Sequence, residues 1–217
     1  MIINTITNIL WHESLNHNLQ CGLESLTLSG WGLEEKNIMM LRKFQNLRTL
    51  IVDSNHFKNE ILENLPDQLE TLEIIQKRNF YGANIKLVYF NSLALDKLKE
   101  HTNIRNLTFS GRFLRNTHIF ACLPINLMVL KIMLSSRVDT LSPANILEKV
   151  TIKKLIIGLD EPNLSLRIYI NINPMKRQYY KTFDFLRNFI DFNSLDELVL
   201  ETADGVVNID KTTYRIK

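Results

Sequence analysis

The segment Leu47-Arg-Thr-Leu50-Ile-Val52-Asp-Ser-Asn55-His-Phe57 decides which fold we expect for this chain. Its first six residues form a phrase: a hydrophobic residue, two variable residues, leucine, one variable residue and a second hydrophobic residue. The 217-residue chain contains this phrase seven times, beginning at Leu23, Leu47, Leu69, Ile104, Leu127, Ile152 and Leu195. One such unit is too small to enclose its apolar side chains, so the units are expected to stack on one another.

The spacing of the phrases predicts the organisation of the chain. Successive first positions lie 24, 22, 35, 23, 25 and 43 residues apart, and repeats with this phrase usually recur every 20 to 29 residues or so. The two long intervals indicate insertions near 80–92 and 160–192. We therefore expect one domain over 1–217, with an N-terminal cap in 1–22, about seven repeats in 23–201 and a C-terminal cap or tail in 202–217.

From its third position onward, each phrase alternates between residues that point outward and apolar residues that point inward, as a half-buried strand does. In the first phrase Leu26 and Leu28 should point inward, and Ser25, Thr27 and Ser29 outward. The sequence thus predicts seven short parallel strands. Their inward side chains form the predicted core: Leu26, Leu28, Leu50, Val52, Leu72, Ile74, Leu107, Phe109, Leu130, Ile132, Leu155, Ile157, Leu198 and Leu200.

Between the phrases the apolar spacing becomes helical. It predicts helices over 33–44, 93–99 and 146–150, and one or two helical turns at 60–65 and 116–123. Both insertions carry strand-like alternation, the first at 85–89 and the second at 166–172. In the second, helical spacing follows over 183–190.

Composition favours a water-soluble, cytoplasmic protein. The 26 basic and 23 acidic residues give a net charge of +3, which by itself indicates neither a nucleic acid nor a membrane as partner. The two cysteines cannot make a disulfide framework. No apolar run reaches the roughly 18 residues that span a bilayer, and the first eleven residues lack the basic segment and cleavage site of a signal peptide.

The repeated phrase resembles that of the leucine-rich repeat family over about residues 23–201. Asn55 stands where the family has an asparagine after the strand, but the other units hold Trp31, Lys77, Arg112, Ser135, Asp160 and Ala203 at that position. Two units begin with Leu65-Pro66-x-x-Leu69 and Leu123-Pro124-x-x-Leu127, which is similar to the FNIP variety of the repeat.

This resemblance implies an α/β solenoid shaped as an arc or horseshoe, with a parallel concave sheet and with irregular turns and short helices on the convex side. It implies a non-enzymatic scaffold that binds another protein on the concave sheet. Some relatives act as substrate adaptors of ubiquitin ligases through an N-terminal F-box. The stretch before Leu23 is short for such a domain, so the adaptor role is an alternative.

No motif for catalysis or for a cofactor accompanies the repeats. The chain has no nucleophile elbow, Gly-rich phosphate loop or metalloprotease helix. Its histidines, which are His12, His17, His56, His101 and His118, do not pair with cysteine at zinc-ligand spacing. Cys21 and Cys122 are interpreted as structural thiols. We therefore expect no enzyme activity, metal or cofactor.

Two clusters combine basic and aromatic residues in the insertions, at 77–81 and 176–181. Cations that contact phosphates and rings that stack on bases are typical of proteins that bind single-stranded nucleic acid. The nearly balanced total charge disfavours this function, which is kept as an alternative. Trp11 and Trp31 are interpreted as packing residues of the N-terminal cap.

The alternation also predicts the binding surface, because every second strand residue faces away from the core. These outward positions form the candidate site: Thr27, Ile51, Asp53, Glu73, Ile75, Thr108, Val129, Lys131, Met133, Lys154 and Ile156. Aliphatic side chains in adjacent strands are more than the scattered apolar exposure of an ordinary surface. Either a partner protein binds them, or the insertions or a second copy of the chain cover them.

Overall fold

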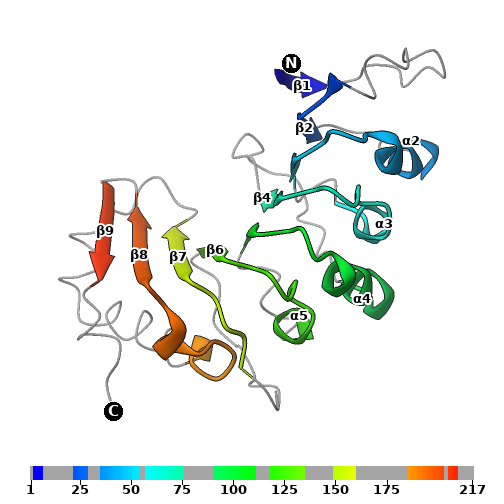
Figure 1. Cartoon of the computed structure of the whole chain (residues 1–217). Helices are drawn as coiled ribbons and strands as arrows, with labels where there is room; N and C mark the ends of the chain where they lie inside the picture. The colour runs from blue at the N-terminus through cyan, green and yellow to red at the C-terminus, as the bar shows by residue number, and fades with distance from the viewer. Residues whose placement is uncertain are drawn as a thin grey trace, which may run out of the picture. The chain divides into compact units, whose positions relative to one another are not determined.

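A computed structural model describes residues 2–6, 22–28, 35–53, 57–75, 90–110, 118–134, 149–159, 185–202 and 205–209 (Figure 1). The chain is α/β, with mostly parallel strands and short helices. It divides into two compact units. Unit 1 contains Met1–Phe109 and Cys122–Asn126, and unit 2 contains Ser110–Ala121 and Leu127–Lys217. The expectation of a single domain stays a prediction.

The described part of unit 1 contains five strands, which pair in chain order and are all parallel. They are β1 (Ile2–Ile6), β2 (Ser25–Leu28), β3 (Thr49–Asp53), β4 (Thr71–Ile75) and β5 (Asn106–Ser110). The equivalent leucines of successive phrases lie side by side in the sheet, for example Leu50 beside Leu72. The first four phrase strands are thus confirmed. Strand β1 was not predicted, because 1–22 contains no copy of the phrase.

The helices of unit 1 are α2 (Glu35–Met39), the 3-10 helix η1 (Met40–Lys43), α3 (Asn59–Glu63) and α4 (Ser92–Glu100). Helices α2, α3 and α4 follow one another along one side of the strands (Figure 1). Helix α4 begins after Asn91, whose side chain accepts a hydrogen bond of 2.7 Å from the Ala94 N–H, the usual role of an N-cap asparagine. It buries Ala94, Leu95 and Leu98 on one face. The predicted helical segments at 33–44, 60–65 and 93–99 are confirmed where they are described.

Unit 2 contains α5 (His118–Ala121), β6 (Val129–Leu134), β7 (Lys154–Leu159), the 3-10 helix η3 (Phe192–Ser194), β8 (Glu197–Thr202) and β9 (Gly205–Ile209). Strands β6, β7 and β8 are parallel, which confirms the last three phrase strands. Strand β9 lies in the predicted C-terminal cap and runs antiparallel to β8.

The helix predicted over 183–190 is wrong in its second half. Residues 185–186 are helical, 187–189 form a turn, and Ile190 forms a parallel bridge with Val150. The Val150 N–H donates to the Phe189 carbonyl at 2.7 Å, and the Asp191 N–H donates to the Val150 carbonyl at 2.9 Å. The Ile190 N–H still donates to the Leu186 carbonyl at 2.8 Å, so the helical bonding ends at Ile190, where the backbone pairs with Val150 instead. The predictions for 85–89 and 166–172 lie outside the described residues, as does 146–148 of the helix predicted over 146–150. That helix is wrong at its end, because Val150 lies in the bridge to Ile190.

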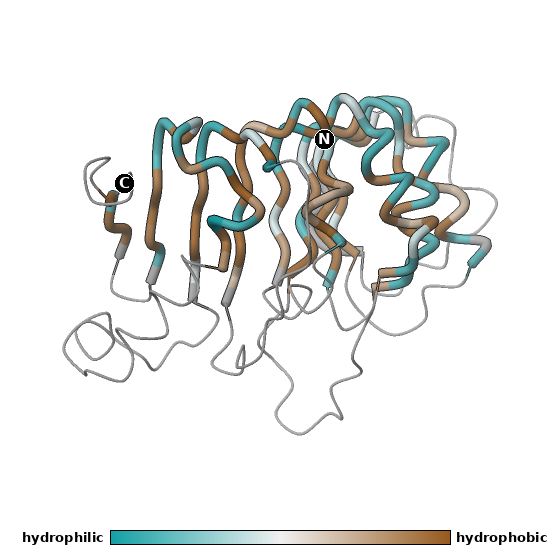
Figure 2. The backbone as a smooth tube through the Cα atoms, turned by 90° about the horizontal axis from the view of Figure 1, so that it is seen from below, coloured by the Kyte–Doolittle hydropathy of each residue, from teal (hydrophilic) through white to brown (hydrophobic). Residues whose placement is uncertain are grey.

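The core follows the predicted alternation. All the predicted core residues except Leu200 are at most 2% exposed. Strands are mainly hydrophobic, whereas the helical segments mix hydrophobic and hydrophilic residues (Figure 2). Leu200 is partly exposed, and so is Val207 beside it in β9, at 38%. Val199, predicted to face outward, is only 4% exposed.

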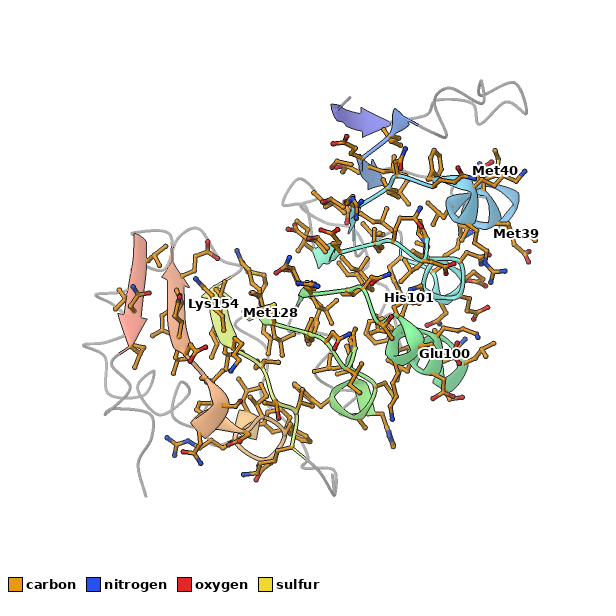
Figure 3. All side chains as sticks on the ribbon, in the orientation of Figure 1. Met39, Met40, Glu100, His101, Met128 and Lys154 are labelled. Carbon is orange, nitrogen blue, oxygen red and sulfur yellow. The ribbon has the colours of Figure 1, made fainter. Side chains whose placement is uncertain are left out.

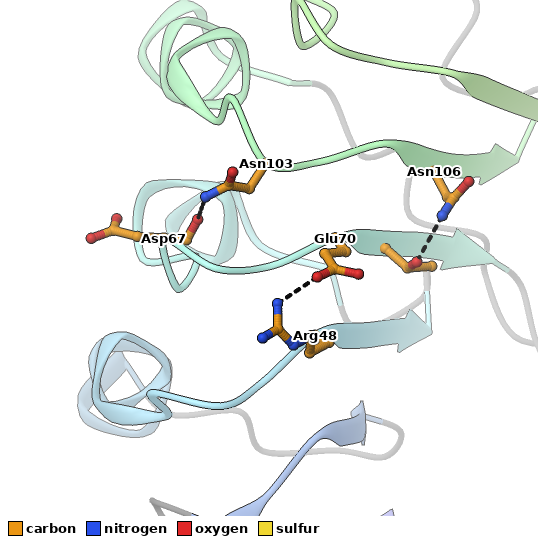
Figure 4. A network of polar contacts seen from close by, with 6 residues as sticks. Arg48, Asp67, Glu70, Asn103 and Asn106 are labelled. Carbon is orange, nitrogen blue, oxygen red and sulfur yellow. Dashed lines mark hydrogen bonds and ion pairs between the residues drawn. The ribbon is translucent and has the colours of Figure 1, made fainter. Parts of the chain in front are cut away.

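Side-chain amides link neighbouring repeats of unit 1 just before the strands. Each amide belongs to the residue that precedes a phrase, and it donates to a backbone carbonyl of the preceding repeat. These bonds are Gln68 Nε2 to Phe44 O at 2.8 Å, Asn103 Nδ2 to Asp67 O at 2.9 Å and Asn126 Nδ2 to Thr102 O at 2.9 Å. Figure 4 shows the bond from Asn103. The amides thus satisfy backbone carbonyl groups between neighbouring repeats.

No helix among the described residues is both long and apolar enough to span a bilayer.

Candidate functional site

The candidate site of unit 1 is the sheet face opposite the core. Thr27, Ile51, Glu73 and Thr108 lie next to one another in the register of β2 to β5. Ile51 and Glu73 are half-buried, whereas Thr27 and Thr108 are only 7% and 8% exposed. The row presents one aliphatic and one acidic side chain to solvent.

Two rows flank this one in unit 1. Asp53 pairs with Ile75 on one side, and Ser25, Thr49, Thr71 and Asn106 form the row on the other side. The Asn106 amide donates to the Thr71 hydroxyl at 3.2 Å (Figure 4). Ile75 is half-buried, but Asp53 is only 4% exposed.

Three of the eleven predicted site residues, Thr27, Asp53 and Thr108, are therefore buried although they face away from the core. They stand at the outward positions that the alternation predicts, but they offer little surface to solvent.

The candidate site of unit 2 covers β6, β7 and β8. Lys131, Ile156 and Val199 form the central row, and Val129, Lys154 and Glu197 form the row nearer the strand starts. A third row contains Met133, Gly158 and Glu201. The five predicted residues, which are Val129, Lys131, Met133, Lys154 and Ile156, are all half-buried.

The charges on this face are paired within the unit. Lys154 Nζ lies 2.6 Å from Glu197 Oε2, between adjacent strands. Lys131 Nζ forms an ion pair with Glu201 Oε2 across the width of β7. The face is thus electrically balanced around its aliphatic residues.

Gly158 makes room for the Met133 side chain on this face. A Cβ atom added at Gly158 would lie 2.9 Å from Met133 Cε, which is closer than such atoms normally approach. The thioether therefore lies over the backbone of β7. Methionine is flexible and polarisable, and it adapts well to a partner's surface.

A row of alternating charges at the second phrase position was missed by the sequence reasoning, because that position was treated as variable. In unit 1 the row reads Glu24, Arg48, Glu70 and Arg105. Arg48 and Glu70 form an ion pair (Figure 4). In unit 2 the row begins with Met128 and continues with Lys153 and Asp196, whose charged atoms lie 3.9 Å apart. Writing the phrases one below another reveals this alternation.

Two described groups, His101 and Cys122, have pKa values shifted mainly by burial. Burial lowers the pKa of His101 more than Asp67 and Glu100 raise it, and this residue lies just after α4 (Figure 3). Burial, followed by the charge of Asp96, raises the pKa of the Cys122 thiol, which makes it a poor nucleophile. Within the described residues no group of three or more side chains could hold a metal ion.

Several residues singled out in the sequence lie outside the described part of the chain. They are the basic-aromatic clusters at 77–81 and 176–181, together with Trp11, Trp31, Cys21, His12, His17 and His56.

Comparison with protein-family models finds no match to the chain, and comparison with curated proteins finds no significant match.

Proposed function

We propose that this protein is a non-enzymatic interaction scaffold that binds another protein through the outward faces of its sheet. The observation that carries the proposal is the composition of the face on β6 to β8. Val129, Met133 and Ile156 are half-buried there, and two internal ion pairs neutralise the charges beside them. The centres of protein interfaces are likewise apolar and depleted of uncompensated charge.

Unit 1 supports the same proposal with a more polar face. Ile51 and Ile75 are half-buried beside Glu73, and hydroxyl and amide side chains flank them. Such a face suits a partner that combines apolar contacts with hydrogen bonds, as the rims of interfaces do.

The proposed arrangement is a leucine-rich repeat solenoid of one domain, in which these faces form the concave surface and the helices the convex layer. The support for it is the seven phrase strands, each parallel to its neighbour within its unit. We further propose that the protein acts in the cytoplasm and requires no cofactor.

The experiment that tests the function is cross-linking from defined positions. A photoreactive amino acid placed at Ile156, on the sheet face, should capture a protein partner from cell extract. The same group at Asp96, which is exposed on α4, serves as the matched control and should capture much less. Capture from Asp96 alone would contradict the proposal, and capture of RNA or DNA that weakens steeply with salt would support the nucleic-acid alternative.

A substitution makes the test quantitative. Ile156→Asp and Ile51→Asp should each weaken partner binding by about 2 kcal/mol or more, which is roughly 30-fold in Kd. Ile125→Asp is the control, because Ile125 is 79% exposed and precedes the strand phrase. All three variants should keep nearly the wild-type Tm. A large drop in Tm for Ile156→Asp would show that the face is covered by the protein itself.

A further inference from the structure

The last strand of unit 2 is exposed on both of its faces. Strand β9 pairs with β8 along one edge, and no described strand pairs with its other edge. Val206 and Val207 are 64% and 38% exposed, and consecutive strand residues point to opposite faces. Asn208 is exposed as well. The described sheet therefore ends in a strand whose outer edge offers backbone donors and acceptors.

The hydrophobic core is incompletely covered at this same end. Ile132, Ile157 and Leu200 occupy one register row. The first two are 0% and 1% exposed, but Leu200 is partly exposed, and Val207 lies beside it in β9. Terminal units of repeat proteins normally present a polar outer surface to keep the protein soluble. This end instead presents valines.

The usual protection of an edge strand is missing from β9. Natural edge strands carry lysine, proline, a bulge or an inward charge that prevents pairing with another chain. Strand β9 reads Gly-Val-Val-Asn-Ile and contains neither a charge nor a proline, and its pairing with β8 runs without a bulge. The neighbouring parallel strands of the unit, in contrast, each carry lysine or glutamate.

We propose that β9 pairs with β9 of a second copy of this chain, antiparallel and around a two-fold axis. Two antiparallel strands match each other's donors and acceptors, and a strand without charge brings no repulsion to its own copy. The pairing would cover the valines and the open end of the core. A two-fold contact uses the same patch on both copies, so it closes as a dimer rather than growing into a fibre. This dimer goes beyond the scaffold function, because it uses the strand edge and leaves the sheet faces available.

Light scattering coupled to size-exclusion chromatography tests the proposal on the full chain. Wild-type protein should elute with twice the 25.4 kDa mass of the chain and dissociate on dilution. Val206→Lys should elute as a monomer, because it adds the edge charge that β9 lacks, whereas Val206→Thr should remain a dimer. Ile125→Lys, at another highly exposed apolar position in unit 1, should also remain a dimer. A wild-type protein that is monomeric at every concentration overturns the proposal.

Cross-linking then locates the contact. In a background without Cys21 and Cys122, single cysteines are placed in turn at positions 205 to 209. At least one should form a disulfide between copies on oxidation, while a cysteine at Asp96 should not. A dimer that cross-links from α4 but from none of the β9 positions would also overturn the proposal, since it would use another surface. Circular dichroism of each variant confirms that the fold is intact.

Discussion

The two units use the same phrase but cover its buried side chains in different ways. In unit 1 helices α2, α3 and α4 supply the covering residues, for example Ile61 on α3 and Leu98 on α4. In unit 2 a group of phenylalanines takes this role. Phe120 stacks on Phe189 at 4.6 Å between ring centroids, and Phe185 lies 4.8 Å from Phe189. The phrase therefore fixes the strand and its inward side chains, while the segment between phrases is free to vary.

The outward faces differ as well. Unit 1 presents threonine, serine and asparagine around two isoleucines, and unit 2 presents aliphatic residues whose neighbouring charges are paired. The outward positions are not constrained by the core, so each unit can change its surface chemistry without changing its fold. The consequence is that substitutions at inward and outward positions should differ greatly in their effect on stability.

The largest expected effect is the loss of stability when one core side chain of each unit is truncated. Phe189→Ala should lower the free energy of unfolding by about 3 to 5 kcal/mol and Leu107→Ala by about 2 to 5 kcal/mol, because these side chains are 0% and 1% exposed. Urea unfolding measures both. The ring group of unit 2 has tight mutual contacts, so we expect the cavity left by Phe189 to collapse little.

Two controls accompany these variants. Met128→Ala in unit 2 and Leu93→Ala in unit 1 remove exposed side chains, which are 44% and 54% accessible. Each should lower the free energy of unfolding by less than about 0.5 kcal/mol. A loss below this value for Leu107→Ala would mean that the inward and outward faces of β5 are assigned the wrong way round.

Much of the fold could be predicted from the sequence. Each phrase specifies where a strand lies, which of its side chains point inward, and which strand lies beside it in the sheet. Leu50, for example, was expected in the core beside its equivalents, and it lies between Leu26 and Leu72 with no exposure. Only Leu200 among the predicted core residues is partly exposed, and its described neighbour on that side is Val207 of the antiparallel strand β9.

The rest depended on contacts that one phrase does not encode. Strand β1 has no phrase, and its place follows from pairing with β2. The turn at 187–189 depends on the bridge to Val150, which is distant in sequence. Within the candidate site, alternation predicted which residues face away from the core. It could not predict that Thr27, Asp53 and Thr108 would be almost inaccessible to solvent, since accessibility depends on what packs around a residue as well as on the direction of its side chain.

A smaller effect tests the amide links of unit 1. Asn103→Ala removes the bond to the Asp67 carbonyl and should cost about 0.5 to 1 kcal/mol, the low end for hydrogen bonds because the site is exposed to solvent. The residue at the equivalent position before the sixth phrase is Thr151, which is exposed in unit 2. Thr151→Ala is therefore the matched control and should change stability by only a few tenths of a kcal/mol. Equal losses for both variants in urea unfolding would show that the amide link contributes nothing specific.

The smallest effect distinguishes the ion pairs of the two units. The side chains of Lys131 and Glu201 are 27% and 36% exposed, whereas those of Arg48 and Glu70 are 55% and 46% exposed. Solvent screens the second pair more strongly, so double-mutant cycles with alanine should give a coupling of about 0.5 to 1 kcal/mol in unit 2 and about 0.2 to 0.5 kcal/mol in unit 1. Added salt should weaken the coupling of Arg48 with Glu70 more than that of Lys131 with Glu201. If the pair in unit 1 were the stronger, the face of unit 2 would be more open to water than its half-buried side chains indicate, and its charges would be available to a partner.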